Sequence, residues 1–209
     1  MKRLSTEIRK EQIKEAALEI IYEEGIGRFT TKRLAAKIGI SEGAIFRHFA
    51  SKKETLLEIL NDVDAQLLAV MKEIEQENET AGIKLQKIVC YTIHYLVKNK
   101  GLSILMLSEI AENSDPEIKS KVQAIFLEQR QIVEAIVRQG LERDELNSET
   151  DPRSFSLLYM GIPVGIHIEL LLNKSEFFED DFCERTSMTF LKSFLKPEFE
   201  MNQNINHPL

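Results

Sequence analysis

The basic residues near the N-terminus are the side chains best suited to contact phosphate. Between Arg28 and Lys53 the sequence has seven Lys or Arg residues and a single acid, Glu42. Residues 1–60 carry 12 basic and 9 acidic side chains, net +3, whereas the remainder carries 15 and 25, net -10. A basic module attached to an acidic chain is the charge pattern expected when one end of a protein meets nucleic acid. A solvated basic face would have the same charge.

Residues 31–49 have the composition of a helix-turn-helix. Two short helices that cross steeply need a small residue where they touch, here Ala35, and the turn between them needs a residue free to adopt positive φ, here Gly39. The apolar residues that should face inward are Leu34, Ile38, Ile40, Ile45 and Phe49, which leaves Lys32, Arg33, Glu42, Arg47 and His48 outside. The segment therefore predicts a DNA-binding helix-turn-helix. A non-binding helical hairpin is the alternative, but it would not need seven bases.

The chemistry of an enzyme or a metal site is not predicted. The four His residues form no His-Glu-x-x-His motif, and the chain has neither a glycine-rich phosphate loop nor a nucleophile elbow. Cys90 and Cys183 allow one disulfide at most, and they lack Cys-x-x-Cys or Cys/His zinc spacing. We therefore expect no catalytic residues, no cofactor, no metal and a reducing, cytoplasmic location.

Composition favours a globular chain of one or two domains, with 209 residues, 43% hydrophobic and 29% charged. The N-terminus has charge but no apolar stretch behind it, so no signal peptide is expected. The longest apolar run, residues 155–172, approaches the length of a membrane span but contains Pro163, His167 and Glu169. We interpret it as a buried helix, with a short membrane anchor as the alternative, and expect no membrane partner.

The spacing of apolar residues predicts an all-α fold of about nine helices, because they recur at three- and four-residue intervals throughout. Gly25 and Gly39 should end the first two helices, and Asp115-Pro116 and Asp151-Pro152 should begin two others. The predicted helices span 6–24, 30–38, 41–48, 51–78, 83–98, 101–112, 115–139, 151–173 and 178–195. One apolar seam continues through residues 56–74, so a single rigid helix should join the basic module to the acidic body.

The first sixty residues resemble the DNA-binding domain of the tetracycline-repressor-like (TetR) family of transcriptional regulators. The matching motifs are a long first helix ending at Gly25, then F-T-T at 29–31, L-A-A-K-I-G-I-S at 34–41, G-A-I-F-R-H-F at 43–49, and S-K-K-E at 51–54 followed by Leu56 and Leu57. The resemblance covers less than a third of the chain. It implies a helix-turn-helix domain at 1–50, a connecting helix at 51–78, a helical ligand-binding and dimerisation domain at 51–196, and a flexible tail at 197–209.

The resemblance also implies roles in DNA binding for individual residues. It places Ser41 to His48 in the major groove, with Glu42, Gly43, Ala44 and Arg47 nearest the bases. Phosphate contacts would come from Arg28, Thr31, Lys32, His48 and Lys52. Arg47 suits either bidentate reading of guanine or a phosphate clamp. Phe46 stands where the family usually has Tyr, so one hydroxyl contact to phosphate is missing.

The resemblance further implies a small-molecule site in the body, and the sequence suggests residues that would line it. Residues 88–97 are apolar nearly all round, so we expect that helix to be buried with Cys90 and His94 on one face. The predicted ligand-binding residues are Cys90, Tyr91, His94, Met106, Ile110, Phe126 and Gln129. The alternative for His94 is a hydrogen bond to a neighbouring carbonyl instead of a ligand contact. The alternative for Gln129 is a position at a solvated edge of the helix packing.

The last two helices are expected to form a homodimer. Gly161 and Gly165 would allow two helix backbones to approach closely, and the last helix has its own stripe. That stripe consists of Phe182, Thr186, Phe190 and Phe194. Glycines that merely flank a kink at Pro163 are the alternative. Together with these residues, the resemblance to the TetR family implies a homodimeric repressor, released from a pseudo-palindromic operator on double-stranded DNA by a small apolar or amphipathic effector. A DNA-bound adaptor whose body binds a protein is the second hypothesis.

Overall fold

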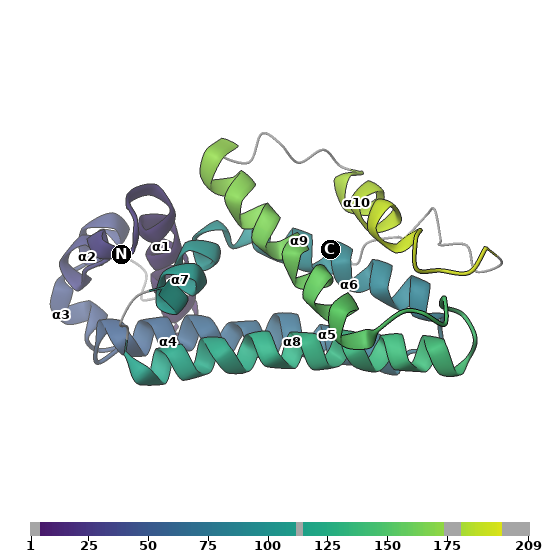
Figure 1. The fold of residues 1–209 in the computed structure, drawn as a ribbon. Helices are drawn as coiled ribbons and strands as arrows, with labels where there is room; N and C mark the ends of the chain where they lie inside the picture. The colour runs from purple at the N-terminus through teal and green to yellow at the C-terminus, as the bar shows by residue number, and fades with distance from the viewer. Residues whose placement is uncertain (1–4, 112–114, 174–180, 198–209) are drawn as a thin grey trace. The chain divides into compact units, whose positions relative to one another are not determined.

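The computed structural model describes residues 5–111, 115–173 and 181–197, and over these residues the protein is helical (Figure 1). In these described residues the ten α-helices form nine continuous helical segments, because α4, a π-helical segment and α5 follow one another without a break. A lone bridge between Leu146 and Leu195 is the only β pairing among the described residues. The predicted all-α fold is confirmed.

Local capping explains the helices of the helix-turn-helix region. Helix α1 (Thr6–Glu24) ends at Gly25, whose φ is +85°, and a short 3-10 turn (Ile26–Arg28) follows. Helix α2 (Thr31–Ile38) begins where the Arg33 N–H donates to the Thr30 hydroxyl (3.2 Å), and it ends at Gly39 in the left-handed region, with φ +70°. The predicted bounds of these two helices are correct, because both ends are encoded by single capping residues.

Helix α3 (Glu42–Ile45) is shorter than the predicted 41–48. Ser41 caps it, accepting from the Ala44 N–H at 3.2 Å. Beyond Ile45 the chain tightens into a turn at residues 46–48, where the His48 N–H donates to the carbonyl of Ile45, three residues back, at 2.8 Å. The N–H groups of Phe46 and Phe49 still donate to carbonyls four residues back, at Glu42 (3.2 Å) and Ile45 (3.0 Å), so the turn continues from α3.

The predicted 51–78 helix is present but contains a π-helical segment. It comprises α4 (Lys52–Asp62), the π segment (Val63–Leu68) and α5 (Ala69–Gln76). The apolar seam is buried as expected at Leu56, Leu60, Val63, Leu67, Met71 and Ile74. A π segment inserts extra backbone into a helix and is a common feature of functional sites.

The remaining helices agree with their predicted positions to within a few residues. They are α6 (Ala81–Lys98), α7 (Lys100–Ala111), α8 (Pro116–Glu142), α9 (Pro152–Asn173) and α10 (Phe182–Leu191). Asp115 and Asp151 cap α8 and α9 as expected, accepting from the N–H of Glu117 (3.0 Å) and of Ser154 (2.8 Å). Residues 178–180, predicted as the start of the last helix, lie outside the described residues, as does the tail from 198.

The chain forms two compact units. The first comprises Met1–Ala65 with Lys98–Ile125, and the second comprises Gln66–Val97 with Phe126–Leu209. These units are not consecutive in sequence, because α7 and the start of α8 group with the helix-turn-helix. One division falls inside the π segment and another inside α8. The two compact units therefore do not coincide with the domains predicted from the sequence, which span 1–50 and 51–196.

Within the first unit, α1 packs against α2, α4 and α7. The approach to α7 is so close that a Cβ on Gly101 would lie 2.0 Å from the carbonyl oxygen of Leu18. Only glycine fits there, since the obstructing atom belongs to rigid helix backbone. Lys14 of α1 reaches α4, where its ammonium lies 2.5 Å from the Asp62 carboxylate. The packing of α1 in the first unit thus includes one close approach between backbones and one partly buried ion pair.

Gly101→Ala should destabilise the first unit. Overpacking typically costs about 1–3 kcal/mol, which exceeds the gain of roughly 0.5–1 kcal/mol in helix propensity. Thermal unfolding monitored by circular dichroism should show a lower Tm. Gly27→Ala is the control, because a Cβ there has nothing within 4 Å. Equal melting temperatures for the two variants would contradict the close contact.

Candidate nucleic-acid interface and sensor region

The recognition helix exposes the residues expected to meet DNA. Ser41, Glu42, Gly43 and Arg47 are exposed, and Ala44 is half-buried. The core behind them is as predicted for Leu34, Ile45 and Phe49, all at 1% exposure or less, whereas Ile38 and Ile40 are only half-buried. The helix therefore presents a small, polar surface with no large side chain before residue 46, which suits close approach to a groove.

Ion pairing separates the seven basic residues into two groups. Arg33 pairs with Glu24, Lys37 with Glu19 and Glu23, and Lys53 with Asp115 and Glu117. Among the described residues, the other four have no carboxylate partner. They are Arg28, Lys32, Arg47 and Lys52. These four are the bases that the sequence assigns to DNA, and their charge is not already neutralised by the protein.

Lys52 is positioned by the turn that precedes α2. Its ammonium lies 5.3 Å from the centre of the Phe29 ring and 3.5 Å from the carbonyl oxygen of Ile26. Phe29 is itself buried. A cation held over an aromatic face keeps its charge while its side chain loses freedom, so Lys52 is prepared to bind an anion.

Thr31 and His48 have features that the sequence did not indicate. The Thr31 hydroxyl donates to the Glu42 carboxylate (2.5 Å), so a phosphate contact through Thr31 would have to replace that bond. Burial, with Arg47, Arg9 and Lys10 nearby, lowers the pKa of His48. The imidazole is therefore neutral at pH 7 and would meet phosphate as a hydrogen-bond donor.

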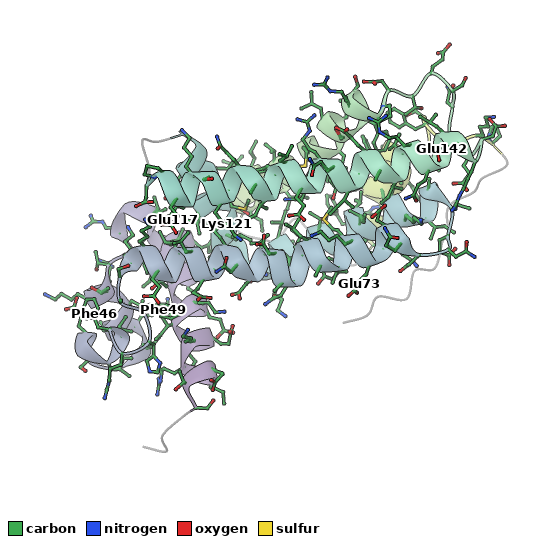
Figure 2. All side chains as sticks on the ribbon, turned by 90° about the horizontal axis from the view of Figure 1, so that it is seen from below. Phe46, Phe49, Glu73, Glu117, Lys121 and Glu142 are labelled. Carbon is green, nitrogen blue, oxygen red and sulfur yellow. The ribbon has the colours of Figure 1, made fainter. Side chains whose placement is uncertain are left out.

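Phe46 is half exposed at the end of the recognition helix, whereas Phe49 is buried (Figure 2). The exposed ring has no hydroxyl to offer phosphate. An apolar ring at this position can contact the methyl group of thymine or the sugar edge instead.

The predicted ligand-binding residues are not all buried. His94 was expected to be buried on α6, but it is exposed, and its Nδ1 lies 2.8 Å from the carbonyl oxygen of Cys90 in the preceding turn. The error has a physical reason: an apolar helix still turns one face outward, and sequence pattern did not identify which. The carbonyl partner, weighed as the alternative, is the one observed.

Tyr91 reaches the π segment. Its hydroxyl donates to the carbonyl oxygen of Gln66 (2.9 Å), a backbone acceptor in the part of the helix where the i to i-4 pattern is interrupted. Burial raises the pKa of Tyr91, so the phenol stays a donor. The residue predicted to contact a ligand thus also bonds to the connecting helix.

The remaining ligand candidates lie in different parts of the chain. Cys90 and Gln129 are buried in the second unit, and Phe126 is half-buried there, whereas buried Met106 belongs to the first unit. The Ile110 side chain lies outside the described residues. Gln129 sits within the buried α8 seam of Ile118, Val122, Ile125, Ile132 and Ile136.

Two buried polar residues of the second unit were missed as ligand candidates. Gln86 on α6 is fully buried, and neither its amide oxygen nor its nitrogen has a partner among the described residues. His167 on α9 is 2% exposed with Nδ1 unpaired, and burial lowers its pKa to about 4. Unsatisfied buried amides are costly and uncommon in native structures. For His167 a polar residue in an apolar run was the available sequence signal, whereas Gln86 lies between Lys84 and Lys87 and had no such signal.

Helix α9 has one packed face and one exposed apolar face. Phe155 and Tyr159 are buried, and the Tyr159 hydroxyl lies 3.1 Å from that of Thr92 on α6. The residues of the exposed face are Leu157, Leu158, Gly161, Val164, Gly165, Ile168, Leu171 and Leu172, with Leu172 72% exposed. By length and composition α9 qualifies as a candidate membrane span over Pro152–Leu172, of which 44% is buried. Packing of its inner face agrees with the predicted core helix.

The predicted stripe of the last helix is partly used within the chain. Phe190 and Phe194 stack on Phe155 of α9, with ring centroids 5.1 and 4.8 Å apart from it. Phe182 and Thr186 are half-buried, and Met188 is exposed. These rings therefore attach α10 to α9 rather than projecting freely outward.

Comparison with known proteins matches one segment of the chain to a family. Residues 13–59 match "Bacterial regulatory proteins, tetR family". The helix-turn-helix segment is therefore a TetR-type domain. The proteins to which the chain is similar include regulators of transcription or metabolism.

The named relatives of this chain are distant. It is 25% identical over 146 residues to the nucleoid occlusion factor SlmA of Marinobacter nauticus, covering 70% of this chain and 73% of that one. It is 26% identical over 150 residues to the fatty acid metabolism regulator protein of Bacillus subtilis, covering 72% and 77%. The crystal structure of FadR from Bacillus subtilis in complex with stearoyl-CoA has the same fold, with a TM-score of 0.69, 22% identity, and coverage of 87% and 95%.

Arg47→Ala and Lys52→Ala should weaken DNA binding in different ways. If Arg47 reads guanine, its loss should cost about 1–3 kcal/mol and relax base preference, whereas loss of Lys52 should weaken all sequences alike. Each lost phosphate contact should also reduce the salt-dependence slope by about one. Lys37→Ala is the matched control, because it removes the same charge from a residue already paired with acids. Mobility shifts in which all three variants bind alike would refute this docking.

Proposed function

We propose that the protein is a homodimeric repressor, released from a pseudo-palindromic operator by a small apolar or amphipathic effector. The observation that carries the DNA-binding part is the group of four basic residues, Arg28, Lys32, Arg47 and Lys52, left without carboxylate partners on the helix-turn-helix. A two-headed protein reads half-sites about 34–36 Å apart, so the operator should have matching symmetry. A cytoplasmic location is part of this proposal.

The exposed face of α9 supports the homodimer. Monomeric proteins rarely leave a contiguous apolar helix face in water. Gly161 and Gly165 lie in this face, and a Cβ on either would meet nothing within 4 Å in the same protomer. Their small size therefore serves no packing need inside the described chain, and the close approach of a second copy would explain it.

Gly161→Leu with Gly165→Leu should abolish or weaken dimerisation. Each protomer has room for both side chains, so the fold should survive and melting should change little. Sedimentation at micromolar concentration should then give a monomer. Gln131→Leu, which adds an exposed apolar side chain on α8, should leave the dimer intact. A parent protein that is itself monomeric in this measurement would refute the proposed homodimer.

The effector would bind in the second unit. Gln86 and His167 offer buried polar groups among apolar helices, which is the composition of small-molecule sites. At pH 7 the imidazole of His167 is neutral, since its pKa is about 4. Such a site favours an apolar body with few polar anchors. Long-chain acyl thioesters are the first class to test, because one relative is named a fatty acid metabolism regulator and a structural neighbour holds stearoyl-CoA.

The response would pass through Tyr91 and the π segment. Three contacts hold that stretch of helix: Asp62 to Lys14, Asp64 to Lys121, and the Gln66 carbonyl to Tyr91. A ligand that displaces α6 would pull on the π segment through the hydrogen bond between the Tyr91 hydroxyl and the Gln66 carbonyl. The ligand must favour one form by several kcal/mol, since equal affinity for both would shift nothing.

A thermal-shift screen with acyl thioesters, followed by operator release, tests the proposal. A ligand at about 100 times its Kd should stabilise the protein by about 2.7 kcal/mol. Tyr91→Phe keeps the ring but loses the bond to Gln66, so it should bind operator and ligand normally yet fail to release DNA. His94→Gln, an exposed change on the same helix, should respond like the parent. Normal induction in Tyr91→Phe would refute this route.

The DNA-bound adaptor is the second candidate, favoured by the likeness to the nucleoid occlusion factor SlmA of Marinobacter nauticus. In that case no thioester, fatty acid or amphipathic drug would shift the melting temperature. A protein partner would instead bind the acidic body without releasing the operator, which a supershifted DNA complex would reveal.

A further inference from the structure

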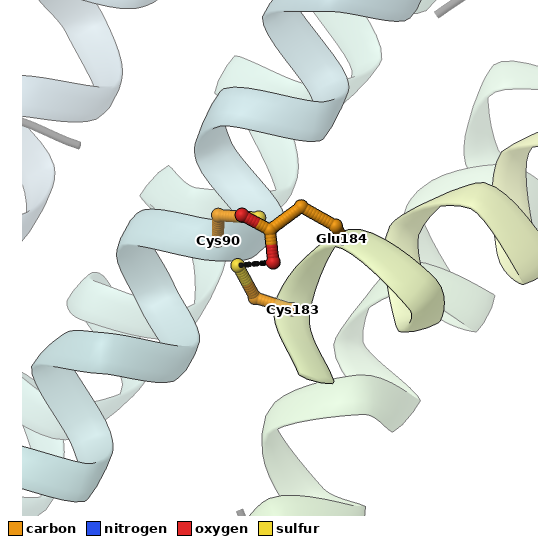
Figure 3. A group of neighbouring side chains, drawn as sticks. All are labelled: Cys90, Cys183 and Glu184. Carbon is orange, nitrogen blue, oxygen red and sulfur yellow. Dashed lines mark hydrogen bonds between the residues drawn. The ribbon is translucent and has the colours of Figure 1, made fainter. Parts of the chain in front are cut away.

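Two cysteines that are 93 residues apart in sequence meet in the second unit. Cys90 lies on α6 and Cys183 on α10, and both are buried, at 1% and 2% exposure. Glu184 follows Cys183 and is half-buried. The three ligand atoms lie within 4.8 Å of one another, and the Cys183 thiol donates to the Glu184 carboxylate at 3.1 Å (Figure 3). They are also the only two cysteines in the chain.

Two sulfurs and a carboxylate oxygen form a donor set for a thiophilic cation. Thiolates select soft or borderline ions, whereas Mg²⁺ and Ca²⁺ require oxygen ligands. With Zn–S near 2.3 Å and Zn–O near 2.1 Å, donors around a tetrahedral zinc lie about 3.5–3.8 Å apart. The observed cluster needs only small side-chain rotations to reach that spacing.

We propose that Cys90, Cys183 and Glu184 bind one Zn²⁺ ion, with the fourth position open to water or another donor. Binding breaks both S–H bonds, forms two Zn–S bonds and releases the two protons to solvent. Two thiolates and one carboxylate then offset the cation, leaving a net charge of -1. No change of oxidation state is involved.

Metal-free protein favours the thiol form, which makes the site dependent on pH. The hydrogen bond with Cys90, burial and the Glu184 carboxylate all raise the pKa of Cys183. Two adjacent buried thiolates would repel one another unless a cation lay between them. Zinc affinity should therefore fall as pH falls, because protons compete for the sulfurs.

The ion would fasten α10 to α6. Helix α10 has only ten residues, and its aromatic contacts with α9 involve Phe190 and the following Phe194. The cluster lies at the opposite, N-terminal end of the helix, at its second and third residues. Zinc would thus hold the end that the phenylalanine stack does not reach.

Metal titration of the full-length, reduced, metal-free protein tests the site. Zn²⁺ in competition with a chromophoric chelator should give one ion per chain, and Cd²⁺ should produce ultraviolet thiolate charge-transfer absorbance. Cys90→Ser and Cys183→Ser should each reduce that absorbance, because only one thiolate donor remains, and should weaken zinc binding by tenfold or more, whereas Glu184→Gln should weaken it less. Asp181→Asn is the control, because it removes a charge beside the cluster without removing a donor.

A measurement on the parent protein guards against variants that misfold. Zn²⁺ should slow alkylation of both cysteines by N-ethylmaleimide, counted by mass spectrometry. The proposal is overturned if the reduced protein binds no zinc, or if the double Cys→Ser variant binds it as tightly as the parent. It is equally overturned if the two thiols form a disulfide in air and the reduced protein binds no metal.

Discussion

The contact between Gly101 and the Leu18 carbonyl is the constraint on which the first unit depends. A Cβ at this position would overlap a backbone oxygen, so α1 and α7 can approach only because residue 101 has none. The contact brings a segment from the middle of the chain into the same unit as the helix-turn-helix. The residues expected to read DNA therefore belong to a compact unit that also contains α7, and α1 packs against that helix.

The π segment is the second place where a stretch that is continuous in sequence is divided between the two compact units. A regular helix from 52 to 76 would transmit any rotation along its length, whereas a π segment contains backbone whose usual hydrogen bonds are interrupted. Three side chains contact this segment or the residue just before it, namely Lys14, Lys121 and Tyr91. Two of these contacts are ion pairs with Asp62 and Asp64, and the third is a neutral hydrogen bond. The neutral hydrogen bond of Tyr91 is the easiest of the three contacts to break, because breaking it leaves no charged side chain without a partner.

Local signals in the sequence were sufficient for most of the fold. Thr30, Gly39, Ser41 and Asp151 each fix a helix end through atoms only a few residues away, so their positions were predictable. The π segment was not, because its seam of buried apolar residues continues across it unchanged. His94 was misplaced for a related reason: apolar spacing shows that a helix packs, but which side faces out depends on partners distant in sequence. The meeting of Cys90 with Cys183 likewise follows from tertiary packing, and spacing rules for zinc motifs cannot detect it.

Charge explains how an acidic protein can present a DNA-binding surface. Each of the three paired bases, Arg33, Lys37 and Lys53, has an acid of the same unit beside it, and these pairs hold helices together at the expense of free positive charge. The four bases that have no carboxylate partner among the described residues are the ones expected to contact DNA, so a local excess of positive charge matters more than the net charge of -7. At physiological ionic strength the Debye length is about 8 Å, so acids farther away than this are largely screened from a phosphate at the recognition helix. The protein therefore needs only a few basic side chains without acidic partners, provided that they lie together. The remaining acidic surface lowers the affinity for nonspecific DNA wherever the helix-turn-helix is not engaged.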